Sequence, residues 1–269
     1  MNNQISIIGC GWLGLPLTKE LIKKGFKVKG TSTSKDKLST LSEYDIDAYY
    51  LKINSENLTG NVKEALSGSD VLVLNIPPGL RNNSEENYVS KIKNLIPYIE
   101  ASKIKKVLFV SSTSVYPDDE TFPEITENTK PNPETESGRQ LLKVEELLQK
   151  NQHFKTTILR FSGLFGNDRH PAKQLSGKTN LKNAQAPVNL IHITDAIHII
   201  EKIIEQDVFG ETFNASTTPH PSKQLYYNSV CKTMGLPLPH YDLSCIGKGK
   251  IILSNKLEEL LNLEFQIKL

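Results

Sequence analysis

The sequence predicts an α/β protein built on a doubly wound parallel sheet with helices on both faces, together with a small C-terminal lobe. Three observations predict this fold class. Short apolar runs alternate with helical patterns over residues 4–111, which is typical of a parallel sheet. Three glycines follow the first apolar run at a spacing used by strand-to-helix turns. The 269 residues suit one large α/β domain, or such a domain with a smaller appendage.

The glycine turn is the feature around which the chain is organised. A strand at 4–8 leads into Gly9, Gly11 and Gly14, and a helical pattern follows at 12–24. In a dinucleotide-binding Rossmann turn, the first glycine allows the tight turn, the second admits a pyrophosphate, and the third lets the helix pack on the strand. The alternative is a glycine-rich turn without a ligand. We expect cofactor contacts from Gly9, Gly11, Trp12, Leu13 and Gly14.

The remaining elements of the first 111 residues follow the same alternation. Helices are predicted at 12–24, 35–43, 62–66 and 84–102, and strands at 26–31, 48–53, 71–76 and 107–111. In such a sheet the ligand crevice lies beyond the carboxyl ends of the strands. We therefore expect Ile76, Pro77 and Ser112 to border the site, and Asn54 to face an adenine.

The end of the second strand bears on the choice of cofactor. NAD-selective turns place an acid there, about 20 residues after the glycines, to bind the ribose 2′-hydroxyl. Here the chain reads Thr31, Ser32, Thr33, Ser34 and Lys35, with no acid before residue 36. Hydroxyls and a lysine suit a 2′-phosphate instead, so the sequence favours NADP over NAD. The alternative is an ordinary polar loop.

Beyond residue 111 the chain predicts fewer regular elements. Residues 117–134 and 162–190 are expected to be loops, the second covering or binding something. The loop at 247–250 is basic, and it either closes over an anionic ligand or is a solvated turn. Thr194 is expected to cap the helix that follows it. The predicted elements are helices at 135–150, 194–205, 221–234 and 254–262, and strands at 158–161 and 212–214.

Composition excludes several classes of function. With 32 basic and 30 acidic residues, the net charge of +2 calls for neither nucleic acid nor an anionic membrane. No apolar run is long enough to span a bilayer, and no signal peptide is visible. The three cysteines have neither metal-ligand spacing nor an even disulfide set, so we expect no metal and a reducing, cytoplasmic setting.

Four further segments follow one another along the chain: Ser111–Tyr116 (SSTSVY), Leu159–Gly166 (LRFSGLFG), Val188–Asp195 (VNLIHITD) and Gly210–Asn214 (GETFN). Together they resemble the extended short-chain dehydrogenases/reductases, which include the nucleotide-sugar epimerases and dehydratases, and the resemblance covers nearly the whole chain. The segments at 9–14 (GCGWLG), 111–116, 137–139 (SGR), 166–171 (GNDRHP) and 247–252 (GKGKII) more closely resemble a small bacterial, atypical branch of NAD(P)-dependent epimerases or dehydrogenases with undefined substrates.

The resemblance implies hydride transfer assisted by a Tyr and a Lys in a Y-x-x-x-K motif, but this chain departs from that motif. Ser137 stands at the Tyr position and Leu141 at the Lys position, with Gly138 and Glu145 supporting the register. A serine hydroxyl is a weak acid and leucine carries no charge. Three interpretations stay open: a substitute cation (Arg139 or, poorly placed, Lys143), another acid (Tyr116, Tyr88 or His170), or cofactor binding without redox chemistry.

The predicted site and domains follow from these matches. The candidate catalytic residues are Ser112, Ser137 and Arg139, and Arg139 could bind a substrate carboxylate or phosphate. The candidate substrate residues are Tyr116, Arg169 and His170. The predicted domains are a nucleotide-binding domain at 1–162, to which 188–214 returns, and a small substrate-binding lobe at 163–187 and 215–269.

Two functions from different classes are therefore compatible with the sequence. One is an NADP-binding oxidoreductase or epimerase-like protein acting on a small polar substrate, for which a nucleotide sugar is one class. The other is a non-catalytic dinucleotide-binding sensor or interaction protein. The apolar positions of the helices at 84–102 and 135–150 also allow a homodimer, although burial against the sheet explains them equally well.

Overall fold

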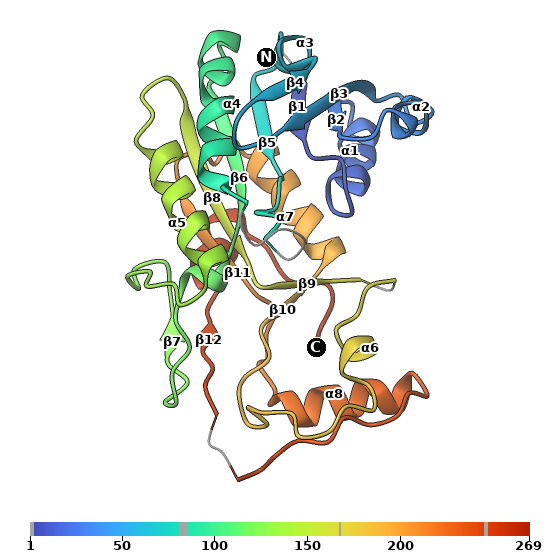
Figure 1. Ribbon diagram of the computed structural model, residues 1–269, viewed down its shortest axis with the longest axis vertical. Coiled ribbons are helices and arrows are strands. Elements are labelled where there is room, and N and C mark those ends of the chain that lie inside the picture. Colours follow the sequence, from blue (N-terminus) through green and yellow to red (C-terminus); the bar gives the residue numbers. More distant parts are fainter. Residues whose placement is uncertain (1–2, 81–85, 167, 245–246) are drawn as a thin grey trace. The chain divides into compact units, whose positions relative to one another are not determined.

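The computed structural model describes residues 3–80, 86–166, 168–244 and 247–269, and the chain forms two compact units (Figure 1). The first unit comprises Met1–Ser112, Thr135–Leu159 and Ile200–Thr212. The second comprises Thr113–Glu134, Arg160–Ile199 and Phe213–Leu269. Four segments that the sequence assigns to the nucleotide-binding domain group with the second unit instead: 113–134, 160–162, 188–199 and 213–214.

An eight-stranded sheet organises the fold, in the order β11-β8-β6-β5-β1-β2-β3-β4. The chain begins at β1 inside the sheet and winds outward in both directions. The pairs β1–β2, β2–β3, β1–β5 and β5–β6 are parallel, and β4 is antiparallel to its neighbour, β3. The predicted doubly wound α/β fold is confirmed. The strands are β1 (Gln4–Ile8), β2 (Lys27–Ser32), β3 (Asp47–Ile53), β4 (Leu58–Gly60), β5 (Val71–Leu74), β6 (Lys106–Ser112), β8 (Lys155–Phe161) and β11 (Thr212–Ala215).

Helices cover this sheet because its central strands are apolar on both faces. All four residues of β5 are buried, as are Ile5, Ile7 and Ile8 of β1, which is the pattern of parallel strands packed between helices. Helix α4 buries Tyr88, Ile92, Leu95 and Ile99, and it packs beside α5 (Figure 1). The helices are α1 (Gly14–Lys23), α2 (Asp36–Ser42), α3 (Val62–Leu66), α4 (Tyr88–Ser102), α5 (Glu136–Gln149) and α7 (Ile193–Glu205).

The second unit has its own core and two small parallel sheets, β9–β10 and β7–β12. Apolar and aromatic side chains around Phe165, Leu190 and Tyr226 form the core. The elements are η1 (Thr113–Val115), β7 (Glu124–Ile125), β9 (Gly163–Phe165), α6 (Ala172–Leu175), β10 (Leu190–His192), α8 (Lys223–Thr233), β12 (Ile251–Ile252) and α9 (Asn255–Leu261).

Two expectations about local structure were wrong in this unit. The predicted loops at 117–134 and 162–190 contain β7, β9 and α6. Strands of two or three residues pair with distant segments, so they leave no local periodicity to detect. Thr194 is not an N-cap, because α7 already begins at Ile193. The Thr194 N–H instead donates to His192 Nδ1 at 3.2 Å, so the imidazole ring caps the helix.

Within the described part of the chain, no helix combines the length and apolar character that crossing a membrane requires.

Candidate functional site

The glycine turn after β1 is built so that two of its glycines are irreplaceable and the third is open. A Cβ on Gly9 would lie 2.3 Å from the Asn75 carbonyl oxygen, and Gly9 also has φ +107°. A Cβ on Gly14 would lie 2.2 Å from the Gly9 carbonyl oxygen. A Cβ on Gly11 would meet no described atom within 4 Å. The turn is thus closed toward the sheet and open at Gly11, where a pyrophosphate would approach the backbone.

Neighbouring strands hold the turn through polar contacts. The Gly9 N–H donates to Thr31 Oγ1 at 3.1 Å, and the Cys10 N–H donates to the Thr31 carbonyl at 3.0 Å. The Asn75 side-chain amide donates to the Gly9 carbonyl at 3.1 Å. Burial raises the pKa of the Cys10 thiol to about 11, and the thiol fits closely against Gly30. Cys10 is therefore a small packing residue of the turn.

Helix α1 presents an open amino end next to this turn. Its N-cap position, Leu13, makes no side-chain capping bond among the described residues, and its first turn carries no acid. The amino end of a helix has unpaired N–H groups and partial positive charge, and both favour a bound phosphate. Leu13 itself is buried, whereas Trp12 is partly exposed.

The end of β2 carries hydroxyls with different surroundings. The Thr31 hydroxyl is buried and accepts the Gly9 N–H, so it supports the turn. Ser32 is partly exposed and its Oγ accepts the Ser34 N–H at 3.1 Å, while Thr33 is exposed. The ammonium of Lys35 lies 5.4 Å from the centre of the Tyr50 ring. Ser32 and Thr33 are thus better placed than Thr31 to meet a ligand.

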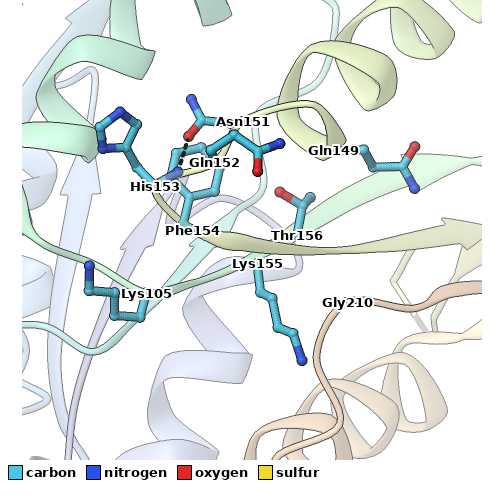
Figure 2. Close-up of a pocket in the computed structure, with 9 residues that line it drawn as sticks. All are labelled: Lys105, Gln149, Asn151, Gln152, His153, Phe154, Lys155, Thr156 and Gly210. Carbon is cyan, nitrogen blue, oxygen red and sulfur yellow. Dashed lines mark hydrogen bonds between the residues drawn. The ribbon is translucent and has the colours of Figure 1, made fainter.

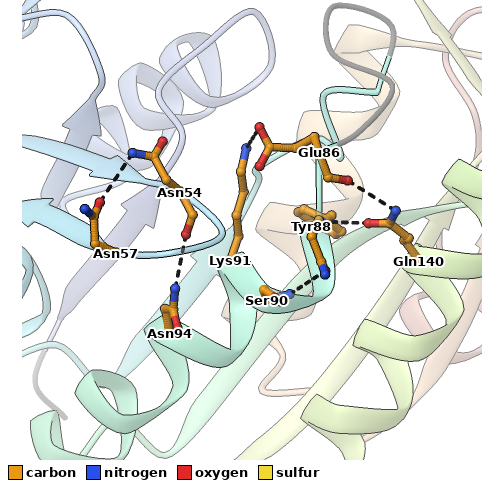
Figure 3. Close-up of polar contacts among 9 residues, drawn as sticks. Asn54, Asn57, Glu86, Tyr88, Ser90, Lys91, Asn94 and Gln140 are labelled. Carbon is orange, nitrogen blue, oxygen red and sulfur yellow. Dashed lines mark hydrogen bonds and ion pairs between the residues drawn. The ribbon is translucent and has the colours of Figure 1, made fainter.

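Helix α4 fixes the carboxyl ends of β3 and β5 (Figure 3). The Asn94 side-chain amide donates to the Asn54 carbonyl at 3.1 Å, as Figure 3 shows, and to the Ser55 carbonyl at 3.1 Å. The buried Tyr88 hydroxyl donates to the Ile76 carbonyl at 2.8 Å. Two positions that the sequence assigns to cofactor contacts therefore have their backbone held by side chains of one helix.

Helix α5 is joined to the start of α4 through Gln140 (Figure 3). Gln140 Oε1 accepts the Tyr88 N–H at 2.7 Å, and its amide donates to the Glu86 carbonyl at 3.2 Å. Glu86 also pairs with Lys91 at 3.1 Å. Sequence reasoning missed the supporting roles of Asn75, Tyr88, Asn94 and Gln140. Only Asn75, a polar residue directly after an apolar strand, gave a local signal.

The candidate catalytic residues lie on β6 and α5 of the first unit. Ser112 is the last residue of β6, and its neighbour Ser111 donates to Glu145 Oε1 at 2.5 Å, which joins α5 to β6. Ser137 lies in the first turn of α5, where Thr135 caps the helix by accepting the Gly138 N–H at 3.1 Å. Leu141 is 4% exposed. It is therefore a core residue of the helix.

Arg139 forms an ion pair on its own helix. Its Nε lies 2.9 Å from Glu136 Oε2, and both side chains are about half exposed. The pKa of Glu136 lies below its usual value because Gln140 donates to the carboxylate, and Arg139 adds a second hydrogen bond. An exposed pair of this kind contributes little to stability, so the guanidinium can exchange its partner for a ligand anion at low cost.

Tyr116 belongs to a buried network in the second unit. Its hydroxyl accepts a hydrogen bond from Arg160 Nη1 at 2.5 Å and lies 3.1 Å from Asn214 Oδ1, to which it can donate. The Asn214 N–H donates to Glu127 at 2.7 Å. Burial raises the pKa of Tyr116, although the charge of Arg160 opposes this effect. The phenol is therefore held among protein groups and poorly suited to release a proton.

His170 has a fixed tautomer in the same unit. Its Nδ1 accepts the Ala172 N–H at 3.1 Å, which leaves Nε2 to donate to the Tyr226 hydroxyl at 3.2 Å. Burial lowers the pKa of His170, so the ring is neutral near pH 7. Arg169 is exposed, and its backbone exchanges hydrogen bonds with Gly166. His170 therefore orders the start of α6, whereas Arg169 faces solvent.

A polar cavity of about 720 Å³ lies elsewhere in the first unit (Figure 2). Lys105 and Lys155 border it, next to the amino ends of β6 and β8. The glycine turn follows the carboxyl end of β1, so this cavity is not the dinucleotide crevice. Among the described residues, no group of three or more His, Cys, Asp or Glu side chains could hold a metal ion.

This geometry defines an NAD(P)-binding fold, and comparison with known proteins places it in a family. The NAD(P)H-binding family matches residues 9–194. The chain belongs to this family.

Individual relatives extend over most of the chain. Protein YeeZ of Escherichia coli (strain K12) is 32% identical over 265 residues, covering 98% of this chain and 96% of that protein. A decarboxylating sterol-4-alpha-carboxylate 3-dehydrogenase of Dictyostelium discoideum is 25% identical, covering 79% of this chain and 71% of that protein. UDP-glucuronic acid 4-epimerase of Bacillus cereus, solved in complex with NAD, superposes with a TM-score of 0.78 at 19% identity, covering 98% and 92%. The family match establishes an NAD(P)H-binding chain, and the superposition establishes the fold.

Proposed function

We propose that this protein is an NADP-dependent oxidoreductase or epimerase that acts on a small polar substrate, with nucleotide sugars as the first class to test. This proposal rests mainly on the glycine turn, in which Gly9 and Gly14 are packed against carbonyl oxygens while the Cα of Gly11 is open. A merely structural turn would not need an open backbone next to the uncapped end of α1.

The preference for NADP is supported by the end of β2. Thr31 supports the turn, and Ser32, Thr33 and Lys35 are left to hold a 2′-phosphate. No acid stands between Thr31 and Lys35 to bind a free ribose hydroxyl or to repel a phosphate. The other proposed contacts are the backbone of Gly11 and Trp12 for the pyrophosphate, Asn54 for the adenine, and Ile76 and Pro77 at the mouth of the crevice.

A bound nicotinamide would supply hydride transfer, and the chain's own residues would orient the substrate. We place Ser112, at the end of β6, and Ser137, in the first turn of α5, as hydroxyl contacts of the substrate. Arg139 would exchange its exposed pair with Glu136 for a carboxylate or phosphate of the substrate. Tyr116, Arg169 and His170 remain proposed substrate residues of the second unit, of which Arg169 is the exposed one.

A second candidate function rests on α5. Leu141, at the position where the related enzymes carry a lysine, is buried and apolar, and Ser137 cannot serve as a strong acid. These residues favour a protein that binds dinucleotide and ligand without hydride transfer. Incubation with NADP and a panel of nucleotide sugars and other small polar alcohols separates the two functions. Growth of reduced-nicotinamide absorbance supports the enzyme, whereas silence from a protein that binds the cofactor favours the sensor.

Cofactor binding is tested through Trp12, the only tryptophan of the chain. Because it lies in the glycine turn, NADPH should quench its fluorescence and show energy transfer from indole to nicotinamide. NADH should do so only at higher concentration. A protein that responds to neither cofactor would remove both candidate functions, and tighter binding of NADH would overturn the choice of NADP.

A single substitution sharpens the choice of cofactor. Thr33→Asp places an acid where the 2′-phosphate is proposed, so repulsion should weaken NADPH binding by about tenfold while NADH binding changes little. Thr40→Asp adds the same charge on an exposed position of α2 and serves as the control. Equal losses in the two variants would mean that the end of β2 does not meet the phosphate.

A further inference from the structure

Lys223, at the start of α8, is a half-buried cation that forms no ion pair within the described part of the chain. Its backbone N–H donates to the Ala186 carbonyl at 2.9 Å, which fixes the residue at the beginning of the helix. Its ammonium makes no hydrogen bond or ion pair with any of the described residues. A partly buried charge without a partner costs free energy, so its presence needs an explanation.

Hydrogen bonds to the backbone connect the segments around Lys223 within the second unit. Pro187 bridges to Ser222, and Asp119 exchanges two hydrogen bonds with Gly249, at 2.9 and 3.0 Å. The Asn189 side-chain amide donates to the Lys250 carbonyl at 2.8 Å. The backbone of the basic loop 247–250 is therefore anchored on both sides.

The aspartates near Lys223 already interact with other lysines. Lys250 pairs with Asp118 at 3.0 Å and also donates to the Tyr116 carbonyl at 2.7 Å. The pKa of Asp119 is lowered by hydrogen bonds from Thr121, and the charge of Lys248 adds to this effect. The acid whose charge acts on Lys223 is Asp118, and Asp118 is already paired with Lys250, so two lysines share one carboxylate.

The charges of Asp118 and Lys250 act on the Lys223 ammonium. Burial lowers the pKa of its ammonium, the charge of Asp118 raises it, and the charge of Lys250 lowers it further. The backbone also places the two lysines near one another. Lys223 binds the Ala186 carbonyl, and a Cβ on Gly249, the residue before Lys250, would lie 2.9 Å from the Ala186 Cβ. An incoming anion would neutralise the excess charge and meet the donors that Lys223 still offers.

We propose that Lys223, together with Lys250, forms an anion-binding subsite in the second unit that takes a phosphoryl or carboxylate group of the substrate. The inference rests on the proposed function for the identity of this ligand as the substrate. The subsite itself needs only the protein and an anion. Its role is to select and orient substrates that carry negative charge.

The direct test is competitive acetylation of the wild-type chain, read residue by residue by mass spectrometry. The probes are inorganic pyrophosphate, UDP and malonate, with uridine as the neutral comparison and sodium chloride to match ionic strength. An anion bound at Lys223 should raise its pKa and slow its acetylation by about tenfold, the change produced by one pKa unit. Lys232, exposed on the same helix, should be unaffected.

The pattern of protection identifies the source of the charge. Protection by pyrophosphate and UDP alone indicates a phosphoryl group, protection by malonate alone indicates a carboxylate, and both together indicate a general anion subsite. If none of the three anions slows acetylation of Lys223, or if all slow Lys223 and Lys232 equally, the subsite is overturned.

A matched pair of variants gives a second measurement. Lys223→Gln should weaken binding of the protecting anion by about tenfold to a hundredfold, whereas Lys232→Gln removes the same charge from the same helix without effect. Equal affinity of the two variants would overturn the inference.

The Trp12 titration with NADPH is run on the same proteins. If NADPH binds but no anion protects Lys223, the subsite is overturned and the proposed function stands. If an anion protects Lys223 but NADPH does not bind, the proposed function is overturned and the subsite stands.

Discussion

The glycine turn of the first unit and the Tyr116 network of the second unit both gather polar groups, but they use different parts of the chain. The turn works through backbone atoms, with Thr31 and Asn75 binding the N–H and C=O groups of Gly9. The network works through side chains, because Tyr116, Arg160 and Asn214 come from three separate segments. The first arrangement leaves backbone exposed at Gly11 for a ligand, whereas the second encloses its polar groups.

The second unit also retains buried polar atoms that find no partner among the described residues. These atoms are Ser162 Oγ, Asn214 Nδ2, Ser216 Oγ, Thr217 Oγ1, His220 Nε2 and Asn228 Oδ1. Buried polar groups are normally paired with protein or with ordered water. The comparison shows that the shape of the glycine turn depends on positions that lack a side chain. The polar interior of the second unit depends instead on the side chains that are present.

The largest effect should come from substitution of a packed glycine. Gly9→Ala forces a side chain onto φ +107° and against the Asn75 carbonyl oxygen, so it should lower the free energy of unfolding by about 3 kcal/mol or more. Urea denaturation followed by circular dichroism measures this loss. A variant as stable as the wild type would show that the turn can rearrange.

Gly11→Ala is the matched control for this substitution. Its Cβ would meet no described atom within 4 Å, so stability should change by less than about 0.5 kcal/mol. Binding of NADPH should nevertheless weaken at least about tenfold, because the methyl group stands where the pyrophosphate approaches. Wild-type affinity would place the pyrophosphate away from Gly11.

A smaller effect is expected in the buried network. Tyr116→Phe removes the acceptor of Arg160 and the donor to Asn214, and should cost about 1–3 kcal/mol because buried polar groups lose a partner. Tyr49→Phe is the control, since the Tyr49 hydroxyl bonds Asp47 at an exposed position. Comparable losses in both variants would show that burial does not amplify the Tyr116 contacts.

The smallest effect concerns pH. Burial lowers the pKa of His170 below the usual 6.5, and the charges of Lys173 and His192 lower it further. The unfolded chain therefore binds more protons as the pH falls below about 6.5, so stability present above that pH is lost on acidification. Thermal melts at pH 7.5 and 5.0 should differ less for His170→Asn, whose amide can still accept the Ala172 N–H.

His220, whose pKa burial also lowers, should keep part of the pH dependence in that variant. An unchanged difference between the two melts would mean that His170 does not titrate in this range.

Prediction from sequence worked where structure is local and repetitive. β5 and α4 were expected close to their observed bounds, because the pattern that predicts each of them lies within the element itself. These patterns are the apolar run that ends at Leu74 and the helical spacing of Tyr88, Ile92, Leu95 and Ile99. It failed for β7, β9 and α6, whose few residues are ordered by partners far away in the chain. His192 as the cap of α7 was missed because histidine is not among the residue types preferred at that position.

By itself, the sequence determined the doubly wound sheet and the glycine turn, because periodicity and glycine spacing are properties of neighbouring residues. The family was indicated by the resemblance of several ordered segments. Only the tertiary structure decided what individual side chains do. It assigned the Thr31 hydroxyl to the turn and closed Tyr116 into a network with Arg160. It also left Lys223 without a counter-ion among the described residues. Contacts of this kind join residues 22 to more than 100 positions apart, a separation over which sequence patterns carry no information about proximity.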